Sequence, residues 1–309
     1  MIPPKKYLIV IQGPTAIGKT SVAIALARYF SSEIISADSR QFFKEMAIGT
    51  AVPSAKELAQ IPHHFIHHKS VEDAYNVGDF EQEAIAKINR LFQKQQVLFL
   101  VGGSGLYVDA VLNGLDHFPE VDSKIREQLN NEFKEQGIES LQEKLKKLDP
   151  LYYEKVDINN VHRIIRALEI SMGTGKSFSS FLGKNTTQRE FIPIKIGLLA
   201  DREIIYEKIN QRVDQMIASG LIEEAKSLYD KRNLNALQTV GYKELFAYFE
   251  NEYSLEFAVE EIKKNTRRYA KRQLTWLRKD EEIIWFESPI EISKIIDFIK
   301  SKTENYRIS

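Results

Sequence analysis

The sequence predicts an α/β fold: a P-loop core with a parallel β-sheet flanked by helices, an inserted helical subdomain and a helical C-terminal region. Three observations predict it. Short apolar runs alternate with helical patterns, a glycine-rich loop directly follows the first run, and one long charged stretch without strand pattern interrupts the alternation. Strands that alternate with helices usually pair in parallel within one sheet.

The strands are predicted from continuous apolar runs, which are typical of strands buried on both faces. These runs lie at 7–11, 33–37, 97–101 and 194–199. Helical periodicity separates them, at 21–30 and at 79–96.

The middle of the chain lacks a convincing strand between about 119 and 189. Its periodicity predicts helices at 124–136, 140–148 and 161–171. A helical block between two strands of one sheet indicates an insertion. We therefore predict a core at 1–118 and 190–309 and an inserted helical subdomain at 119–189. The C-terminal stretches 202–249 and 254–279 are predicted to be nearly all helix.

Composition excludes several classes of function. Lys+Arg and Asp+Glu both count 43, so the chain is not a globally basic nucleic-acid coat, although a local basic patch is possible. The absence of cysteine excludes disulfides, thiolate metal sites and a cysteine nucleophile. No apolar run approaches the ~20 residues that span a bilayer, and the N-terminus does not read as a signal peptide. We expect a cytoplasmic protein with no membrane partner.

The glycine-rich loop fits the pattern G-x-x-x-x-G-K-[ST]. Its glycines let successive backbone N–H groups face a diphosphate at the positive end of the following helix. The predicted diphosphate- or nucleotide-binding residues are Gly13, Pro14, Thr15, Ala16, Ile17, Gly18, Lys19 and Thr20. Lys19 supplies a point charge, and the Thr20 hydroxyl is the predicted ligand of a Mg²⁺ cofactor. A similar Gly-Lys-Ser sequence at 175–177 follows a helix, so we interpret it as a helix C-terminus with a glycine cap.

The loop pattern alone does not identify the reaction. An NTPase usually adds a strand closed by an acidic residue that holds Mg²⁺. The run at 97–101 ends instead in Gly102 and Gly103. The remaining candidate is Asp38, after the second predicted strand, as a Mg²⁺-associated acid, a general base or a simple cap.

A basic helix is predicted at 261–279, where eight Lys or Arg accompany one Glu. On a helical wheel at about 100° per residue, Ile262, Tyr269 and Trp276 gather on one side. The cations fill the other side, where Leu274 is the single apolar exception. Such a cationic face predicts contact with RNA phosphates, including Lys271 and Arg272. The four histidines of 63–68 are interpreted as packed or hydrogen-bonded rather than metal-binding.

Seven motifs now agree in order along nearly the whole chain. They are GPTAIGKT (13–20), DSRQ (38–41) with IGT (48–50), PHH (62–64), VGGSGLY (101–107), RIIRALE (163–169), VGY (240–242) and KRQLTWL (271–277). Together they resemble the bacterial tRNA dimethylallyltransferase family, also called tRNA isopentenyltransferases.

The resemblance implies transfer of a dimethylallyl group from dimethylallyl diphosphate to N6 of the adenosine 3′-adjacent to the anticodon. Asp38 matches the family's general base, Thr15 its loop threonine and Arg212 its diphosphate-binding arginine. With Lys19 they form the implied catalytic set. The resemblance also implies that 1–118 and 190–309 form the catalytic core and that the inserted subdomain at 119–189 binds tRNA. The implied partner is the anticodon stem-loop of tRNA, and we expect the chain to act as a monomer. The positions that match RNA contacts are Asp38, Ser39, Arg40, Gln41, Ser104, His162, Arg163, Ile164, Ile165 and Arg166. His162 and Ser104 stand where members often carry glutamine and threonine.

Three rival functions stay open at this point. A plant-type adenylate isopentenyltransferase uses a free nucleotide, and a small-molecule P-loop kinase uses ATP. A non-enzymatic RNA-binding module would leave the complete phosphate loop without a purpose.

Overall fold

The computed structural model describes residues 5–184 and 187–303. The chain divides into two compact units, Met1–Leu112 with Arg189–Ser309, and Asn113–Gln188. Within the part of the chain that is described, no helix is both long and apolar enough to cross a membrane.

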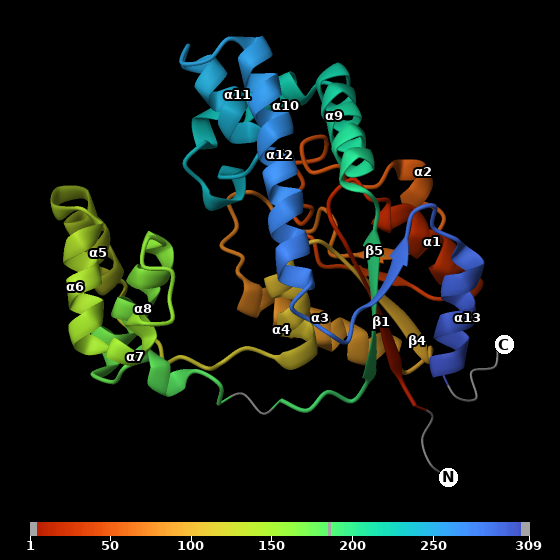
Figure 1. The fold of residues 1–309 in the computed structure, drawn as a ribbon, viewed down its shortest axis with the longest axis horizontal. Helices are drawn as coiled ribbons and strands as arrows, with labels where there is room; N and C mark the ends of the chain where they lie inside the picture. Colours follow the sequence, from red (N-terminus) through yellow and green to blue (C-terminus); the bar gives the residue numbers. More distant parts are fainter. Residues whose placement is uncertain (1–4, 185–186, 304–309) are drawn as a thin grey trace. The chain divides into compact units, whose positions relative to one another are not determined.

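A six-stranded parallel sheet forms the centre of the first unit (Figure 1). Its strands lie in the order β3-β2-β4-β1-β5-β6. They span Tyr7–Gln12 (β1), Ile34–Ser36 (β2), His63–His64 (β3), Val97–Val101 (β4), Ile192–Leu199 (β5) and Ile284–Glu287 (β6). The parallel sheet, which contains the four strands predicted from apolar runs, confirms the predicted fold class. The sequence patterns did not predict β3 or β6, which lie at the two edges.

The sheet is covered on both faces, as its apolar strands require. Leu8 and Val10 of β1 join the cluster formed with α3 (Val77–Leu91), α4 (Gly105–Asn113), α10 (Leu221–Ser227) and α11 (Tyr242–Phe249). Ile9 and Ile11 join the opposite cluster, formed with α1 (Lys19–Tyr29), α13 (Ile292–Lys302) and the start of α9 (Arg202–Ala218). Successive side chains of a strand point to opposite faces, so every residue of β1 is buried.

The remaining helices of this unit follow or interrupt the strands. The short α2 (Ala55–Leu58) begins with Ser54 and Glu57 in a capping box. The long α12 (Leu255–Leu277) contains most of the predicted basic segment. Two 3₁₀ turns, Tyr229–Lys231 and Asn235–Leu237, lie between α10 and α11.

The second unit is helical in its described residues. It contains α5 (Ser123–Gln136), α6 (Ile138–Leu148), α7 (Pro150–Tyr153), α8 (Val161–Thr174) and a 3₁₀ turn at Phe178–Phe181. Leu129, Leu141 and Leu168 lie in its separate apolar core. Gly175 ends α8 in the left-handed conformation, at φ 68°. The second Gly-Lys-Ser sequence is therefore a helix cap, as predicted.

Candidate functional site

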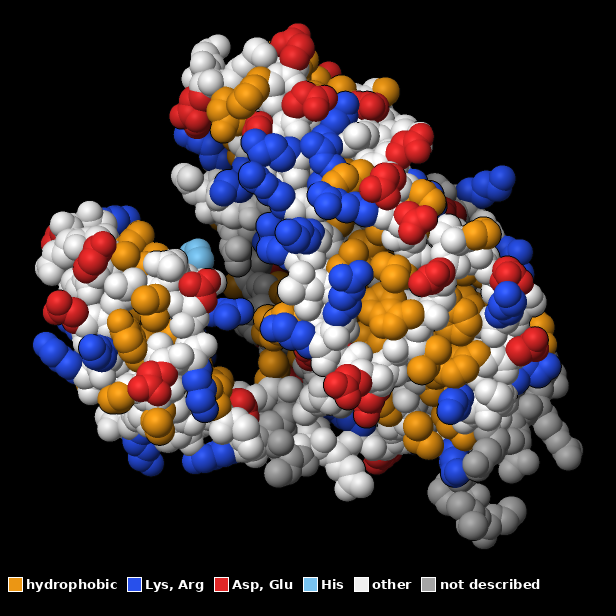
Figure 2. All heavy atoms as spheres, viewed as in Figure 1, with side chains coloured by type: hydrophobic (Ala, Val, Ile, Leu, Met, Phe, Trp, Pro, Cys, Tyr) orange, Lys and Arg blue, Asp and Glu red, His pale blue; other side chains and the backbone are white. Residues whose placement is uncertain are grey.

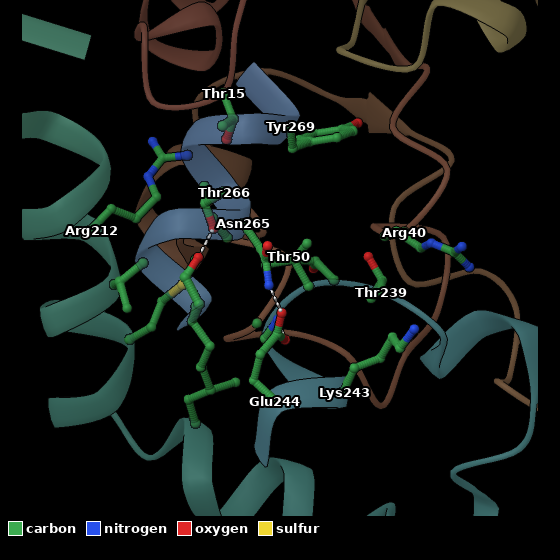
Figure 3. Close-up of a pocket in the computed structure, with 18 of the residues that line it drawn as sticks. Thr15, Arg40, Thr50, Arg212, Thr239, Lys243, Glu244, Asn265, Thr266 and Tyr269 are labelled. Carbon is green, nitrogen blue, oxygen red and sulfur yellow. Dashed lines mark hydrogen bonds between the residues drawn. The ribbon is translucent and has the colours of Figure 1, made fainter. Parts of the chain in front are cut away.

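A cavity of about 1160 Å³ lies within the first unit, where β1 and β2 end (Figure 3). Carboxyl ends of parallel strands are the usual binding edge of an open α/β sheet. The cavity is lined by Thr15, Lys19, Thr20, Asp38 and Arg212, which come from three separate segments of the chain: the phosphate loop, the turn after β2, and α9. The structure thus brings the whole implied catalytic set to one place.

The phosphate loop (residues 13–20) connects β1 to α1. Gly13 and Gly18 have φ angles of 152° and 105°, which glycine adopts without steric cost. A Cβ atom at position 13 would also lie 2.7 Å from the carbonyl oxygen of Leu198 on β5. Thr15, Ala16, Gly18, Lys19 and Thr20 line the cavity, whereas Ile17 is buried in the core.

Lys19 folds back on its own loop. Its ammonium donates to the carbonyl oxygens of Gly13 (3.0 Å) and Pro14 (2.9 Å). The pKa of Lys19 is lowered from 10.5 to about 8, chiefly by burial. The negative charge of Asp38 raises this pKa, and the positive charge of Arg212 lowers it. A desolvated cation of this kind is stabilised by an anion beside it. The loop is therefore suited to a phosphate group.

Asp38 follows β2 and begins a tight turn. Its Oδ1 accepts the backbone N–H of Arg40 at 3.1 Å. The next residue, Ser39, joins this turn to the loop after β4: its N–H donates to Oγ of Ser104 at 3.2 Å, and the two hydroxyls lie 3.1 Å apart. Two sequence motifs from neighbouring strands therefore support each other beside the carboxylate.

Arg40 and Gln41 contact the protein as well as the cavity. Arg40 donates to the carbonyl oxygens of Asn235 (2.9 Å) and Ala236 (3.1 Å). Gln41 donates to the carbonyl oxygen of Thr50 at 3.1 Å. Both side chains also line the cavity, so they hold its wall and border its interior.

Arg212 reaches the cavity from α9. Desolvation lowers the pKa of its guanidinium, and the charge of Asp38 opposes that shift. In Figure 3 its side chain lies near Thr15 and Thr266. Tyr269 of α12 lines the same space, and its pKa is raised to about 12 by desolvation and by Asp38. The cavity therefore places the cations Lys19 and Arg212 close enough to the Asp38 carboxylate for its charge to act on both.

The helix α12 has a buried face and a cationic face. Ile262, Ala270, Gln273 and Leu277 are buried. Lysine and arginine side chains gather over this helix in Figure 2. Lys263 bonds to Asp214 and Glu260, and Arg267 donates to Asn210, whereas Lys271 and Arg272 are exposed. The predicted wheel needs two corrections. Leu274 packs against the cluster of Ile9 and Ile205, and Trp276 remains 44% exposed.

A half-buried carboxylate explains two of the motifs. Glu224 on α10 accepts backbone N–H groups from Ala47 (3.0 Å), Ile48 (2.8 Å) and Gly49 (2.9 Å). It also accepts the hydroxyl of Tyr242 at 2.7 Å. The motifs at 48–50 and 240–242 are therefore structural neighbours, and both border the cavity. Sequence reasoning missed Glu224 because a lone acid on a helix carries no signal of long-range bonds.

The second unit contains the other predicted RNA contacts. His162 and Arg163 are exposed. Ile164 and Ile165 are buried in the core of that unit, so their side chains hold α8 in place instead of facing RNA. Arg166 donates to Glu169 at 2.9 Å and lies over the ring of Phe118.

Arg126 joins Arg166 on the same acid. Its Nε and terminal nitrogen donate to the two oxygens of Glu169, at 3.0 and 2.8 Å, and Glu169 is 6% exposed. Both guanidiniums are thus held side by side in fixed orientations. Sequence patterns did not single out Arg126.

The histidines at 63–68 have structural partners. His64 lies 2.7 Å from Glu33, His63 bonds to the carbonyl oxygen of Ile61, and His68 packs edge-on against Phe42. Among the described residues, no three His, Asp or Glu side chains cluster closely enough to hold a metal ion. His63, His64 and His68 are thus packed or hydrogen-bonded, whereas Nε2 of His67 is buried without a hydrogen-bond partner among the described residues.

Comparison with known proteins places this arrangement in a family. The model of the IPP transferase family matches residues 41–280. The chain belongs to the IPP transferase family. This family member is 61% identical to the tRNA dimethylallyltransferase of Christiangramia forsetii, over 96% of this chain and 98% of that protein. It is 55% identical to the enzyme of the same name from Flavobacterium psychrophilum, over 97% and 99% of the two chains.

Solved structures agree with this IPP transferase fold. The full-length tRNA isopentenylpyrophosphate transferase of Bacillus halodurans is 39% identical, with a TM-score of 0.73 over 97% of each chain. A eukaryotic dimethylallyltransferase acting on tRNA is 26% identical, with a TM-score of 0.79 over 99% of this chain and 81% of that one.

Proposed function

We propose that this member of the IPP transferase family is a tRNA dimethylallyltransferase. It transfers the dimethylallyl group from dimethylallyl diphosphate to N6 of the adenosine 3′-adjacent to the anticodon and releases diphosphate. The observation that carries the proposal is the single cavity that joins the phosphate loop, Arg212 and Asp38.

The cations of the cavity suit the leaving group. When the allylic C–O bond breaks, its electron pair goes to the diphosphate, whose negative charge grows. Lys19, Arg212 and the N–H groups of the phosphate loop stabilise that charge as it develops. The guanidinium of Arg212 adds bidentate contacts that a lysine does not offer.

A magnesium ion fits the same cavity as the cofactor. Mg²⁺ prefers oxygen ligands and commonly binds through one or two protein groups, substrate phosphates and waters. The hydroxyl of Thr20 lines the cavity and supplies such an oxygen. When bound, Mg²⁺ neutralises charge on the diphosphate oxygens.

Asp38 is suited to receive the proton of the acceptor. The exocyclic amine of adenine is a weak nucleophile because its lone pair is delocalised into the ring. As the new N–C bond forms, one N–H proton passes to the Asp38 carboxylate, which restores a neutral amine. Single-stranded loops offer the RNA bases that leave their stack at least cost, which favours an anticodon loop as the acceptor.

The exposed cations of α12 supply a surface for the rest of the RNA. Lys271 and Arg272 contact phosphates in this proposal, as do Arg163 and Arg166 of the second unit. An enzyme for free adenylate needs no such surface, and neither does a small-molecule kinase. We further propose that the protein is cytoplasmic and acts as a monomer.

The test is a parallel assay with Mg²⁺ and labelled dimethylallyl diphosphate, offered either unmodified tRNA or AMP. Label in tRNA alone is the expected result. Label in AMP alone would make the protein a nucleotide prenyltransferase. A separate reaction with ATP and small acceptors detects a kinase, and phosphate transfer without any prenyl transfer would overturn the proposal.

A further inference from the structure

The side chain of Gln273 connects the basic helix to the phosphate loop. Gln273 lies on α12 and is 7% exposed. Its Oε1 accepts the backbone N–H of Thr15 at 2.8 Å, and its Nε2 donates to the carbonyl oxygen of Gly103 at 2.9 Å. One amide thus bonds to the loops that follow two neighbouring strands, β1 and β4.

The first contact fixes the orientation of one peptide unit of the phosphate loop. The carbonyl oxygen of the Pro14–Thr15 peptide accepts from Lys19 at 2.9 Å, and its N–H donates to Gln273. The same peptide is therefore held from both ends. It precedes Ala16, whose φ of 65° is unusual for a residue with a side chain. A backbone in this conformation persists when surrounding contacts hold it.

The contact of Gln273 with Gly103 requires a glycine at position 103. A Cβ atom at position 103 would lie 2.2 Å from Nε2 of Gln273. Two residues along, a Cβ atom at Gly105 would lie 2.5 Å from the indole nitrogen of Trp276. The motifs at 101–107 and 271–277 therefore meet through Gln273 and Trp276, side chains one helical turn apart on α12.

We propose that Gln273 is a positioning residue for the diphosphate site. It makes no contact with a reacting atom. It holds the Thr15 N–H toward α12, so that the loop residues that line the cavity, among them Thr15, Gly18 and Lys19, face the diphosphate. Because α12 also presents Lys271 and Arg272, the helix that contacts RNA in the proposed function is bonded directly to the phosphate loop. The link to RNA rests on the proposed function. The role of Gln273 in diphosphate binding rests only on the geometry of the phosphate loop.

The test is binding of inorganic diphosphate with Mg²⁺ to the full-length protein by calorimetry. Gln273→Met keeps the length of the side chain and removes both hydrogen bonds. We expect diphosphate affinity to fall about tenfold, the usual effect of losing one to two net hydrogen bonds. The KM for dimethylallyl diphosphate should rise by a similar factor, while tRNA affinity stays unchanged. Gln93→Met is the matched control, because Gln93 is exposed near the start of β4, away from the phosphate loop.

A second variant separates positioning from general loss of structure. When protonated, the side chain of the Gln273→Glu variant can still accept from the N–H of Thr15 and donate to the carbonyl oxygen of Gly103. When ionised, it has no proton to donate and repels that carbonyl oxygen. The variant's diphosphate affinity relative to the parent should therefore recover as pH falls, while the Gln273→Met ratio stays flat. Gln93→Glu should follow the parent at every pH.

Parent-like diphosphate affinity and KM in both Gln273 variants would overturn the inference. Weaker binding by Gln273→Glu at every pH, with no recovery, would also overturn it, because that result indicates a general packing role. If the parent binds diphosphate but transfers no prenyl group to tRNA, the proposed function is wrong. The binding test then still shows whether Gln273 positions the diphosphate site.

Discussion

Gly49 lies directly against the ring of Tyr242, so that a Cβ atom at position 49 would come within 2.6 Å of the phenolic oxygen. The same oxygen donates to Glu224, which also binds the backbone N–H of Gly49. Two motifs far apart in the sequence thus share one carboxylate, and both motifs border the cavity. This contact explains why a glycine and a tyrosine stand at these positions without any role in chemistry.

Glu224→Ala should lower the free energy of unfolding by about 3 kcal/mol, because it leaves several donors without their acceptor. Chemical denaturation of the purified protein measures this change. Glu223→Ala, which removes an exposed neighbouring acid, should change stability little. Equal stability of the two variants would contradict the structural role of Glu224.

Asp38→Asn should reduce kcat for prenyl transfer by about 100-fold to 10,000-fold, the usual contribution of a positioned general base. The substitution keeps the shape of the side chain and removes its ability to take the proton. Single-turnover assays measure the rate, and filter binding should show that tRNA is still bound. Asp297→Asn on the exposed surface of α13 serves as the control. Turnover within a few-fold of the parent would exclude Asp38 as the base.

Affinity for dimethylallyl diphosphate should fall as pH rises through the pKa of Lys19, about 8. Lysine is charged below its pKa, so the cation that faces the diphosphate is present at low pH and lost at high pH. Between about pH 7 and about pH 9 the affinity should decrease roughly tenfold. Calorimetry without tRNA measures it. Lys19→Met should bind weakly with no such pH dependence, and a parent-like slope in that variant would assign the titration to another group.

Reversal of two charges, Lys271→Glu with Arg272→Glu, should weaken tRNA binding roughly tenfold and lower its salt slope by between one and two. These side chains are exposed on α12. In the proposed function they bind RNA phosphates and release the salt cations that were bound there. Binding is measured across a salt series, with the Lys300→Glu and Lys302→Glu pair on α13 as the control. Parent-like binding at every salt concentration would show that this face of α12 does not contact RNA.

The interior of the fold was predictable from sequence, and its edges were not. Continuous apolar runs such as 7–11 belong to strands covered on both faces, and that burial leaves a clear pattern. The edge strand Ile284–Glu287 is only partly buried, because nothing pairs with its outer side, so its residues show no comparable run. His63–His64 is too short for any periodicity.

The site residues divide in the same way. Lys19 and Thr20 belong to a local pattern, so sequence alone pointed to them. Gln273 and Glu224 act through bonds to backbone groups distant in the chain, and no local spacing encodes such partners. Leu274 was assigned to the cationic side of its helix because a wheel assumes one apolar face. In the structure α12 packs against two different clusters.

The pairing of Tyr7 with Ile192 constrains how the nascent chain folds. β1 leaves the ribosome first, yet one of its two neighbours follows the entire unit Asn113–Gln188. That unit is a helical bundle with its own core, and such local contacts form quickly. Until β5 emerges, one edge of a wholly apolar strand stays unpaired and prone to aggregation. Chains stalled before residue 192 should therefore carry a folded helical bundle together with an open sheet that requires a chaperone.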